Sequence, residues 1–140
     1  MFDYYGIPRD TPGYDCAEKE LYSRIESIEN SVDSDIDLNN CRFNLIVHEF
    51  EALLFSEPSV YAGHSKHVVE QVNSICMQYE NPEFIDNSPS TSPSKRLKDI
   101  IPEYSKVRYG KMLAEEIGID RMLEKCPHFR KWVEMIISQG

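Results

Sequence analysis

Long apolar runs, paired cysteines and basic residues in the first half are all scarce in this sequence of 140 residues. No apolar run approaches the roughly 20 residues that a membrane-spanning helix needs, so a membrane protein is not expected. Residues 1–5 have neither the basic start nor the long apolar stretch of a signal peptide. Together these absences predict a cytoplasmic protein.

The four cysteines stand far apart in the chain and include no Cys-x-x-Cys pair. This spacing is a poor pattern for zinc binding, and without a signal peptide reduced thiols are expected rather than disulfides. They are interpreted as core or incidental residues: Cys16, Cys41, Cys76 and Cys126.

Negative charge is concentrated in the first half of the chain. The net charge is −9, and residues 1–56 carry 4 basic and 12 acidic side chains, whereas residues 92–140 carry 10 basic and 7 acidic ones. An acidic half repels phosphate groups unless cations bridge them, so nucleic acid would need a divalent metal there and help from the basic tail. An ordinary solvated acidic surface explains the same distribution.

The pattern of apolar residues predicts one α/β domain over residues 1–140. A hydrophobic fraction of 41% and an aromatic fraction of 11% suit a globular chain of this length. Strands are predicted at 2–5 and 42–47, loops at 33–40 and 81–93, and helices at about 17–31, 49–55, 65–79, 93–101, 106–117, 120–125 and 127–138. Residues 1–56 form the α/β part, with the acidic cluster, and residues 57–140 the mainly helical part.

The segment from Phe43 to Phe55 is the most informative, because it places one histidine and two carboxylates where an apolar strand turns into an apolar helix. Ligands of open α/β sheets bind beyond the carboxyl ends of the strands, where Asp3, His48, Glu49 and Glu51 are expected to converge. Carboxylate oxygens suit a hard cation such as Mg²⁺, which activates water and stabilises charge on a phosphoryl group. In the alternative interpretation the acids have no such function and are stabilised by the dipole of the helix they begin.

Two further motifs are candidates for chemistry. Ser94, Lys95 and Arg96 open a helix, where backbone amides and two cations suit a phosphate, although a capped surface helix has the same pattern. Cys126 and His128 flank Pro127 and resemble a nucleophile beside a base, but the end of one helix and the start of the next explain them as well.

Several segments together resemble a bacterial family of domains of unknown function, numbered forty-two seventy-six. The resemblance is carried by MFDYYGIP (residues 1–8), HEFEALLF (48–55), NPE (81–83), PSKR (93–96) and KCPHF (125–129), which occur in order along nearly the whole chain. The resemblance implies a TOPRIM-like fold with a partial parallel sheet. It also implies proximity in the genome to ATPases of bacterial defence-type systems.

A TOPRIM-like site implies metal-dependent phosphodiester chemistry with Mg²⁺ or Mn²⁺. Asp3 matches the first residue of the Asp-x-Asp pair of such sites, and Tyr5 stands in place of the second. Glu49 and Glu51 resemble the further acidic element, as in overcoming-lysogenization-defect nucleases. The metal ligands implied are thus Asp3, Glu49 and Glu51, with Glu49, Glu51 and His48 as catalytic groups and residues 94–96 for phosphate.

The glutamate of the first TOPRIM strand has no counterpart in this sequence. Met1 resembles an internal methionine of the family, so the chain is expected to lack N-terminal strands and hence part of its site. Two functions follow. The first is a nuclease or phosphoryl-transfer subunit acting on nucleic acid, and the second is a non-catalytic binding or sensor module that partners an AAA-type or ABC-type ATPase.

Overall fold

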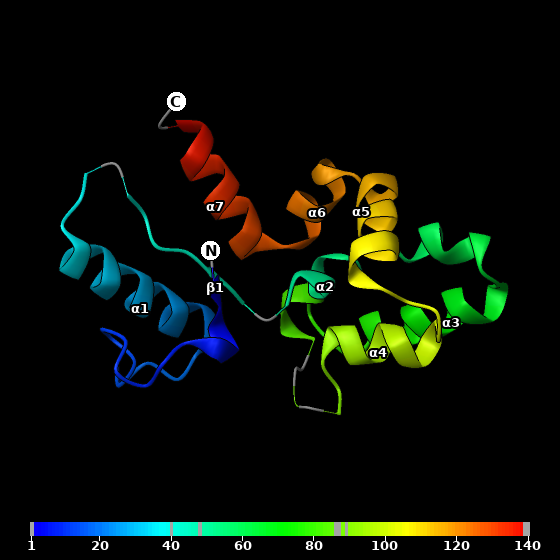
Figure 1. Ribbon diagram of the computed structural model, residues 1–140, viewed down its shortest axis with the longest axis horizontal. Coiled ribbons are helices and arrows are strands. Elements are labelled where there is room, and N and C mark those ends of the chain that lie inside the picture. Colours follow the sequence, from blue (N-terminus) through cyan, green and yellow to red (C-terminus); the bar gives the residue numbers. More distant parts are fainter. Residues whose placement is uncertain (1, 40, 48, 86–87, 89, 139–140) are drawn as a thin grey trace. The chain divides into compact units, whose positions relative to one another are not determined.

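The computed structural model describes residues 2–39, 41–47, 49–85, 88 and 90–138 (Figure 1). The chain divides into two compact units, Met1–Val47 and His48–Gly140. The described residues are mixed α/β and mostly helical, with a small parallel sheet, which confirms the predicted fold class at this coarse level. No helix in this part of the chain is both long and apolar enough to cross a membrane.

The first unit consists of two short parallel strands and the helix between them in sequence. Strand β1 (Phe2–Asp3) pairs with β2 (Leu45–Ile46) in parallel, with Phe2 opposite Leu45 and Asp3 opposite Ile46. Helix α1 (Leu21–Ile36) lies between them in the chain. Its apolar face packs onto β2 in a cluster of buried residues made of Ile25, Ile28, Val32, Leu45 and Val47.

Both strands are shorter than predicted, and carboxylates of α1 bond to amides at β2. The Phe43 amide donates to Asp33 Oδ1 at 2.6 Å, and the Leu45 amide donates to Glu29 Oε1 at 2.8 Å. Leu45 is the first residue of β2, so these bonds tie the strand to the helix. In β1, a 3₁₀ turn already begins at Tyr4.

Helix α1 begins and ends later than the predicted 17–31, so the predicted loop at 33–40 is wrong over its first residues. The Glu20 carboxylate accepts hydrogen bonds from the amides of Tyr22 and Ser23, which caps a helix that begins at Leu21. At the other end Asp37 adopts a left-handed conformation with φ of 49°, which ends the helix. The prediction relied on apolar spacing and missed both terminal signals.

One arginine ties the loop after β1 to α1. The Arg24 guanidinium donates from Nε to the Tyr4 hydroxyl at 2.8 Å and from its other nitrogens to the carbonyls of Tyr14 and Cys16. A planar guanidinium satisfies several carbonyl acceptors at once, which a lysine ammonium does less well. This contact holds the long connection from η1 (Tyr4–Gly6) against the helix.

Helices and helical turns are the regular elements of the second unit among the residues described. Its α-helices are α2 (Phe50–Leu53), α3 (Lys66–Cys76), α4 (Pro93–Ile100), α5 (Lys111–Ile117), α6 (Ile119–Lys125) and α7 (Pro127–Ser138). Short 3₁₀ turns occur at η2 (Pro58–Gly63) and η3 (Pro82–Phe84), and a π-helical turn, η4 (Lys106–Gly110), precedes α5.

Helices α3 and α4 follow the sequence prediction closely because their caps are local. The Ser65 hydroxyl accepts from the Val68 amide, and the Ser92 hydroxyl accepts from the Lys95 amide ahead of Pro93. The predicted helix at 106–117 is corrected, since its first turn is π-helical. It ends at Gly118, whose φ of 77° disfavours any residue with a side chain.

The core of the second unit gathers around the chain that follows α2. Fully or almost fully buried side chains include Leu54, Phe55, Tyr61, Leu97 and Leu113, drawn from several elements. The Tyr61 hydroxyl is satisfied inside this core by the Leu54 carbonyl at 2.9 Å. Since α2 and the residues after it pack with later helices, they belong to this unit rather than to the strand that precedes them.

Helix α7 has the predicted bounds but not all of the predicted burial. The apolar spacing of residues 127–138 predicts that Ile136 and Ile137 are buried, yet they are 49% and 72% exposed. Phe129, near the start of the helix, packs against the core cluster. The helix is anchored at that end, where the buried Glu83 carboxylate accepts from the amides of His128 and Phe129 at 3.0 and 2.9 Å.

This anchor gives the first testable prediction. Replacing Glu83 with alanine removes a buried acceptor from two amides at the start of α7, so the free energy of unfolding should fall by about 3 kcal/mol. Urea unfolding measures the change. The matched control is Glu80→Ala, an exposed glutamate three residues earlier, which should change stability little. Equal stability of the two variants would contradict this role of Glu83.

Candidate functional site

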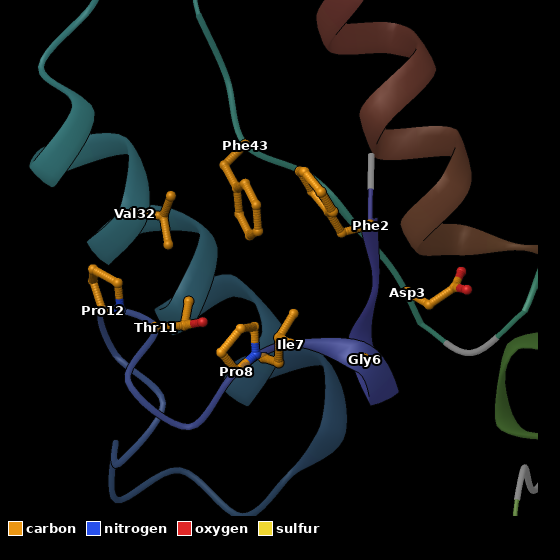
Figure 2. A pocket seen from close by; sticks show the side chains of 9 residues that line it. All are labelled: Phe2, Asp3, Gly6, Ile7, Pro8, Thr11, Pro12, Val32 and Phe43. Carbon is orange, nitrogen blue, oxygen red and sulfur yellow. The ribbon is translucent and has the colours of Figure 1, made fainter.

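Asp3 lies at the carboxyl end of β1, as predicted, and is exposed. It borders a pocket of about 350 Å³ within the first unit, whose lining is otherwise mostly apolar. Figure 2 shows the rings of Phe2 and Phe43 in this pocket, stacked with centroids 5.5 Å apart, while the Asp3 carboxylate points away from them. The acid therefore faces outward from the pocket that it borders.

Glu49 is the residue immediately before α2, and its side chain reaches a different helix. Its Oε2 accepts a hydrogen bond from the Ser94 amide at 2.8 Å, in the first turn of α4. A carboxylate at a helix start meets unpaired amides and the positive end of the helix dipole. Glu49 therefore occupies a position at α4 of the kind that was predicted to hold a phosphate.

Glu51 points into the second unit and is only 2% exposed. Its Oε1 accepts from the Tyr104 hydroxyl at 3.4 Å, and its Oε2 lies 3.1 Å from Lys106 Nζ. The Lys106 contact is an ion pair without hydrogen-bond geometry, which leaves Oε2 without a hydrogen bond. Burial, together with the nearby Glu51 charge, raises the pKa of Tyr104, so this phenol stays protonated and acts as a donor.

The predicted convergence of the acids stays a prediction. His48 lies outside the described residues. Asp3 belongs to the first unit and the two glutamates to the second. Within the second unit Glu49 and Glu51 have different partners, Ser94 and the Tyr104–Lys106 pair.

These carboxylates do not form the open set that a Mg²⁺ or Mn²⁺ ion needs. Across the residues that the structure describes, no three His, Cys, Asp or Glu side chains gather closely enough to hold a metal. Hard divalent cations take several oxygen ligands around one point. Here the Lys106 ammonium lies beside Glu51 and a backbone amide occupies one oxygen of Glu49, so metal binding by these two acids stays a prediction.

The predicted phosphate residues all lie at the start of α4, where each has a partner. The Ser94 amide bonds to Glu49, and Lys95 Nζ lies 2.5 Å from Asp99 Oδ1 on the exposed face of the helix. Arg96 donates to the Thr91 carbonyl at 2.6 Å and to the Tyr79 hydroxyl at 2.8 Å. Arg96 thus joins α4 to the turn after α3, and phosphate binding here stays a prediction.

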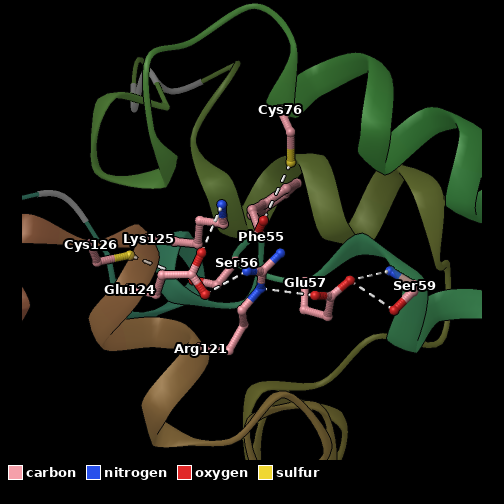
Figure 3. A network of polar contacts seen from close by, with 9 residues as sticks. All are labelled: Phe55, Ser56, Glu57, Ser59, Cys76, Arg121, Glu124, Lys125 and Cys126. Carbon is pink, nitrogen blue, oxygen red and sulfur yellow. Dashed lines mark hydrogen bonds and ion pairs between the residues drawn. The ribbon is translucent and has the colours of Figure 1, made fainter.

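Cys126 is a core residue, which agrees with the structural interpretation of its motif. It is fully buried, and its Sγ lies 3.5 Å from the Ser56 hydroxyl, as Figure 3 shows. Burial raises the pKa of the Cys126 thiol to about 12 and that of Cys76 to about 11. Both thiols are therefore protonated at neutral pH, and a nucleophilic role for Cys126 is not supported.

A polar network links α6 to the turn η2 next to these thiols (Figure 3). Arg121 pairs with Glu57 at 2.9 Å and with Glu124 at 2.6 Å. Glu57 also accepts from the hydroxyl and amide of Ser59, and the Ser59 hydroxyl is the main cause that lowers the pKa of Glu57. This arrangement caps η2 and has the features of a structural contact rather than a reactive one.

With this geometry in place, the comparison with known families is informative. The family described as "Domain of unknown function (DUF4276)" matches residues 1–137. This chain belongs to that family. The sequence resemblance to it is confirmed over nearly the whole chain. No curated protein and no solved structure matches the chain.

The sequence analysis did not identify the two partners of Glu51 in the acidic segment. Tyr104 and Lys106 lie more than fifty residues after Glu51, and no local pattern connects them. A buried carboxylate requires a hydrogen-bond donor or a cation, so the sequence could have indicated that Glu51 has such a partner. Its identity follows only from the packing of η4 against α2.

The Glu51–Lys106 pair gives a second prediction. Lys106→Met should lower the free energy of unfolding by about 1–3 kcal/mol, because it leaves a buried carboxylate without its cation. The double variant Glu51→Gln/Lys106→Met should recover part of that loss. A double-mutant cycle measured by urea unfolding gives the coupling. Additive single effects would show that the two side chains do not interact.

The thiol environments give a third prediction. A soluble disulfide reagent should modify Cys41, which is exposed, rapidly in the native protein. Cys126 should react only after unfolding, because its thiol is buried and its pKa is raised to about 12. Mass spectrometry of labelled peptides identifies the modified residue. Native-state labelling of Cys126 at the rate of Cys41 would contradict its assignment to the core.

Proposed function

We propose that this chain is a TOPRIM-like phosphoryl-transfer domain that acts on nucleic acid in a bacterial defence-type system. The observation that carries the proposal is the order β1, α1, β2, in which two parallel neighbouring strands are separated by a helix. Asp3 ends β1, and Glu49 and Glu51 follow β2 in sequence. In open α/β sheets, groups at the carboxyl ends of parallel strands are the ones that meet ligands.

The charge distribution favours binding of a polyanion only in the C-terminal part of the chain. Residues 92–140 carry an excess of basic side chains, which favours contact with phosphates. The acidic part of the chain repels phosphates. We therefore expect the proposed activity to require Mg²⁺ or Mn²⁺, as the TOPRIM resemblance implies. Among the described residues, no three His, Cys, Asp or Glu side chains are close enough together to hold this ion.

A second candidate function is a non-catalytic binding or sensor module that partners an ATPase of the AAA or ABC type. The observation that favours it is the engagement of the two glutamates: Glu49 caps α4, and Glu51 is paired with Lys106. Carboxylates with structural partners of this kind stabilise a fold without any chemistry. This function predicts a stable complex with the neighbouring ATPase and no hydrolysis.

A fourth prediction tests the phosphoryl-transfer function. The full-length protein, incubated with Mg²⁺ or Mn²⁺, should cleave labelled single-stranded DNA, duplex DNA or RNA, and chelation should abolish the cleavage. Glu49→Gln should abolish it too, because the variant removes the charge while its amide oxygen still accepts from the Ser94 amide. Asp3→Asn, at the end of β1, should behave in the same way.

The controls separate lost chemistry from lost folding. Glu80→Gln, at an exposed site, should cut normally, and each variant should keep the melting temperature of the wild type. A divalent ion that binds the native protein should raise that temperature. If Glu49→Gln cuts as fast as the wild type, the role of Glu49 is wrong. If no metal supports cleavage but the ATPase co-elutes with the chain in size-exclusion chromatography, the binding-module function holds instead.

A further inference from the structure

A second pocket lies wholly within the second unit, among α2, α5, α6 and the π-helical turn η4. Its cavity volume is about 460 Å³, within the range of about 300–1,000 Å³ common for small-molecule sites. The residues that line it include Phe50, Lys106, Lys111, Glu115, Ile119 and Met122. None of these six was predicted to act in the acidic site.

The apolar residues that line this pocket suit a flat ring. Phe50 presents an aromatic side chain that is half-buried, and Met122, which also lines the pocket, is 5% exposed. Ile119 is 51% exposed, so it presents apolar surface that a ligand would cover. Aromatic rings, thioethers and aliphatic groups all pack well against a planar heterocycle.

Two lysines with different environments also line the pocket. Lys106 Nζ lies 5.6 Å from the centroid of the Phe50 ring and 3.1 Å from Glu51 Oε2, which fixes its position. Lys111 is paired with Glu115 at 3.7 Å, and both side chains are largely exposed, at 75% and 69%. Exposed pairs of this kind contribute little, so Lys111 is free to exchange Glu115 for a stronger anion.

Gly110 allows the backbone to pass close to the ring that forms this pocket. A Cβ atom there would lie 3.5 Å from Phe50 Cε1 and 3.2 Å from the Tyr104 hydroxyl. The contact with Phe50 would be ordinary, but a side chain would press on the Tyr104 hydroxyl and through it on Glu51. The π-helical turn that ends at Gly110 is of a rare type that occurs often at functional sites.

We infer that this pocket binds a nucleoside monophosphate group, with the base against Phe50, Ile119 and Met122 and the phosphate at Lys111 and Lys106. A simple anion would leave the apolar lining residues unused, and a purely apolar ligand would leave two cations beside it. A base joined to a phosphate uses both kinds of lining residue. Single-stranded nucleic acid is held by the same combination of aromatic stacking and cationic groups.

The nucleotide has two possible sources, a free mononucleotide or one residue of a strand. Only the second source rests on the proposed function. Isothermal titration calorimetry with AMP, adenosine, inorganic phosphate and a short oligo(dA) strand distinguishes them. AMP should bind about tenfold more tightly than adenosine or phosphate. Tighter binding of the strand than of AMP assigns the pocket to nucleic acid, and equal binding assigns it to the free nucleotide.

Substitutions of lining residues test whether AMP binds in this pocket. Lys111→Ala should lower the affinity for AMP about fivefold and leave the affinity for adenosine unchanged, since it removes only a phosphate contact. Ile119→Asp should weaken AMP and adenosine alike, and an acid is tolerated at the first residue of α6 by the helix dipole. The matched control is Lys66→Ala. Lys66 forms the same type of exposed pair, 3.7 Å from Glu70, but does not line the pocket.

Unchanged AMP affinity in Lys111→Ala, an equal loss in Lys66→Ala, or no binding of AMP or oligo(dA) by the wild type would overturn the inference. If Ile119→Asp does not fold, the AMP affinity of Lys111→Ala by itself tests the inference. The result is separable from the cleavage assay. If AMP binds but the protein does not cleave nucleic acid, the nucleotide site is supported and the proposed function is contradicted. If the protein cleaves but the pocket variants have no effect, only the nucleotide site is contradicted.

Discussion

Carboxylate side chains that accept hydrogen bonds from backbone amides are the interaction on which both units depend. The helices and turns are short, so a large share of their amides lie at element starts, where no carbonyl of the same helix is available. Glutamates and one aspartate supply the missing acceptors: Glu20 at α1, Glu29 and Asp33 before β2, Glu49 at α4, Glu57 at η2 and Glu83 at α7. At least these six of the 24 acidic side chains therefore have a structural use.

This use of acids changes how the acidic segment is understood. Glu49 and Glu51 are two residues apart, and a sequence pattern alone treats them as one paired element. In the folded chain Glu49 reaches the first turn of α4, while Glu51 is buried beside Tyr104 and Lys106. A carboxylate bound to an amide keeps its charge and can still bind a cation through its other oxygen. The proposed chemistry at Glu49 therefore has to coexist with its contact to α4.

The parts of the fold that followed from sequence are those with local signals. Helix α4 has a serine cap and an early proline, and α7 starts at a proline and runs to the predicted residue. The bounds of α1 were missed because Glu20 is an uncommon cap and because Asp37 rather than glycine ends the helix. The exposure of Ile136 and Ile137 was missed because apolar spacing marks one face of a helix and does not say where the core ends.

The sequence by itself determined the mixed α/β class, the family, and the residues that follow each strand, because periodicity, caps and motifs are properties of neighbouring positions. Only the tertiary structure decided what those residues contact. Lys106 meets Glu51, Glu83 meets the start of α7, and Lys111 joins Phe50 and Ile119 around one pocket. These contacts join positions far apart in the chain, and long-range packing, which places them together, leaves no trace in the local sequence around either partner.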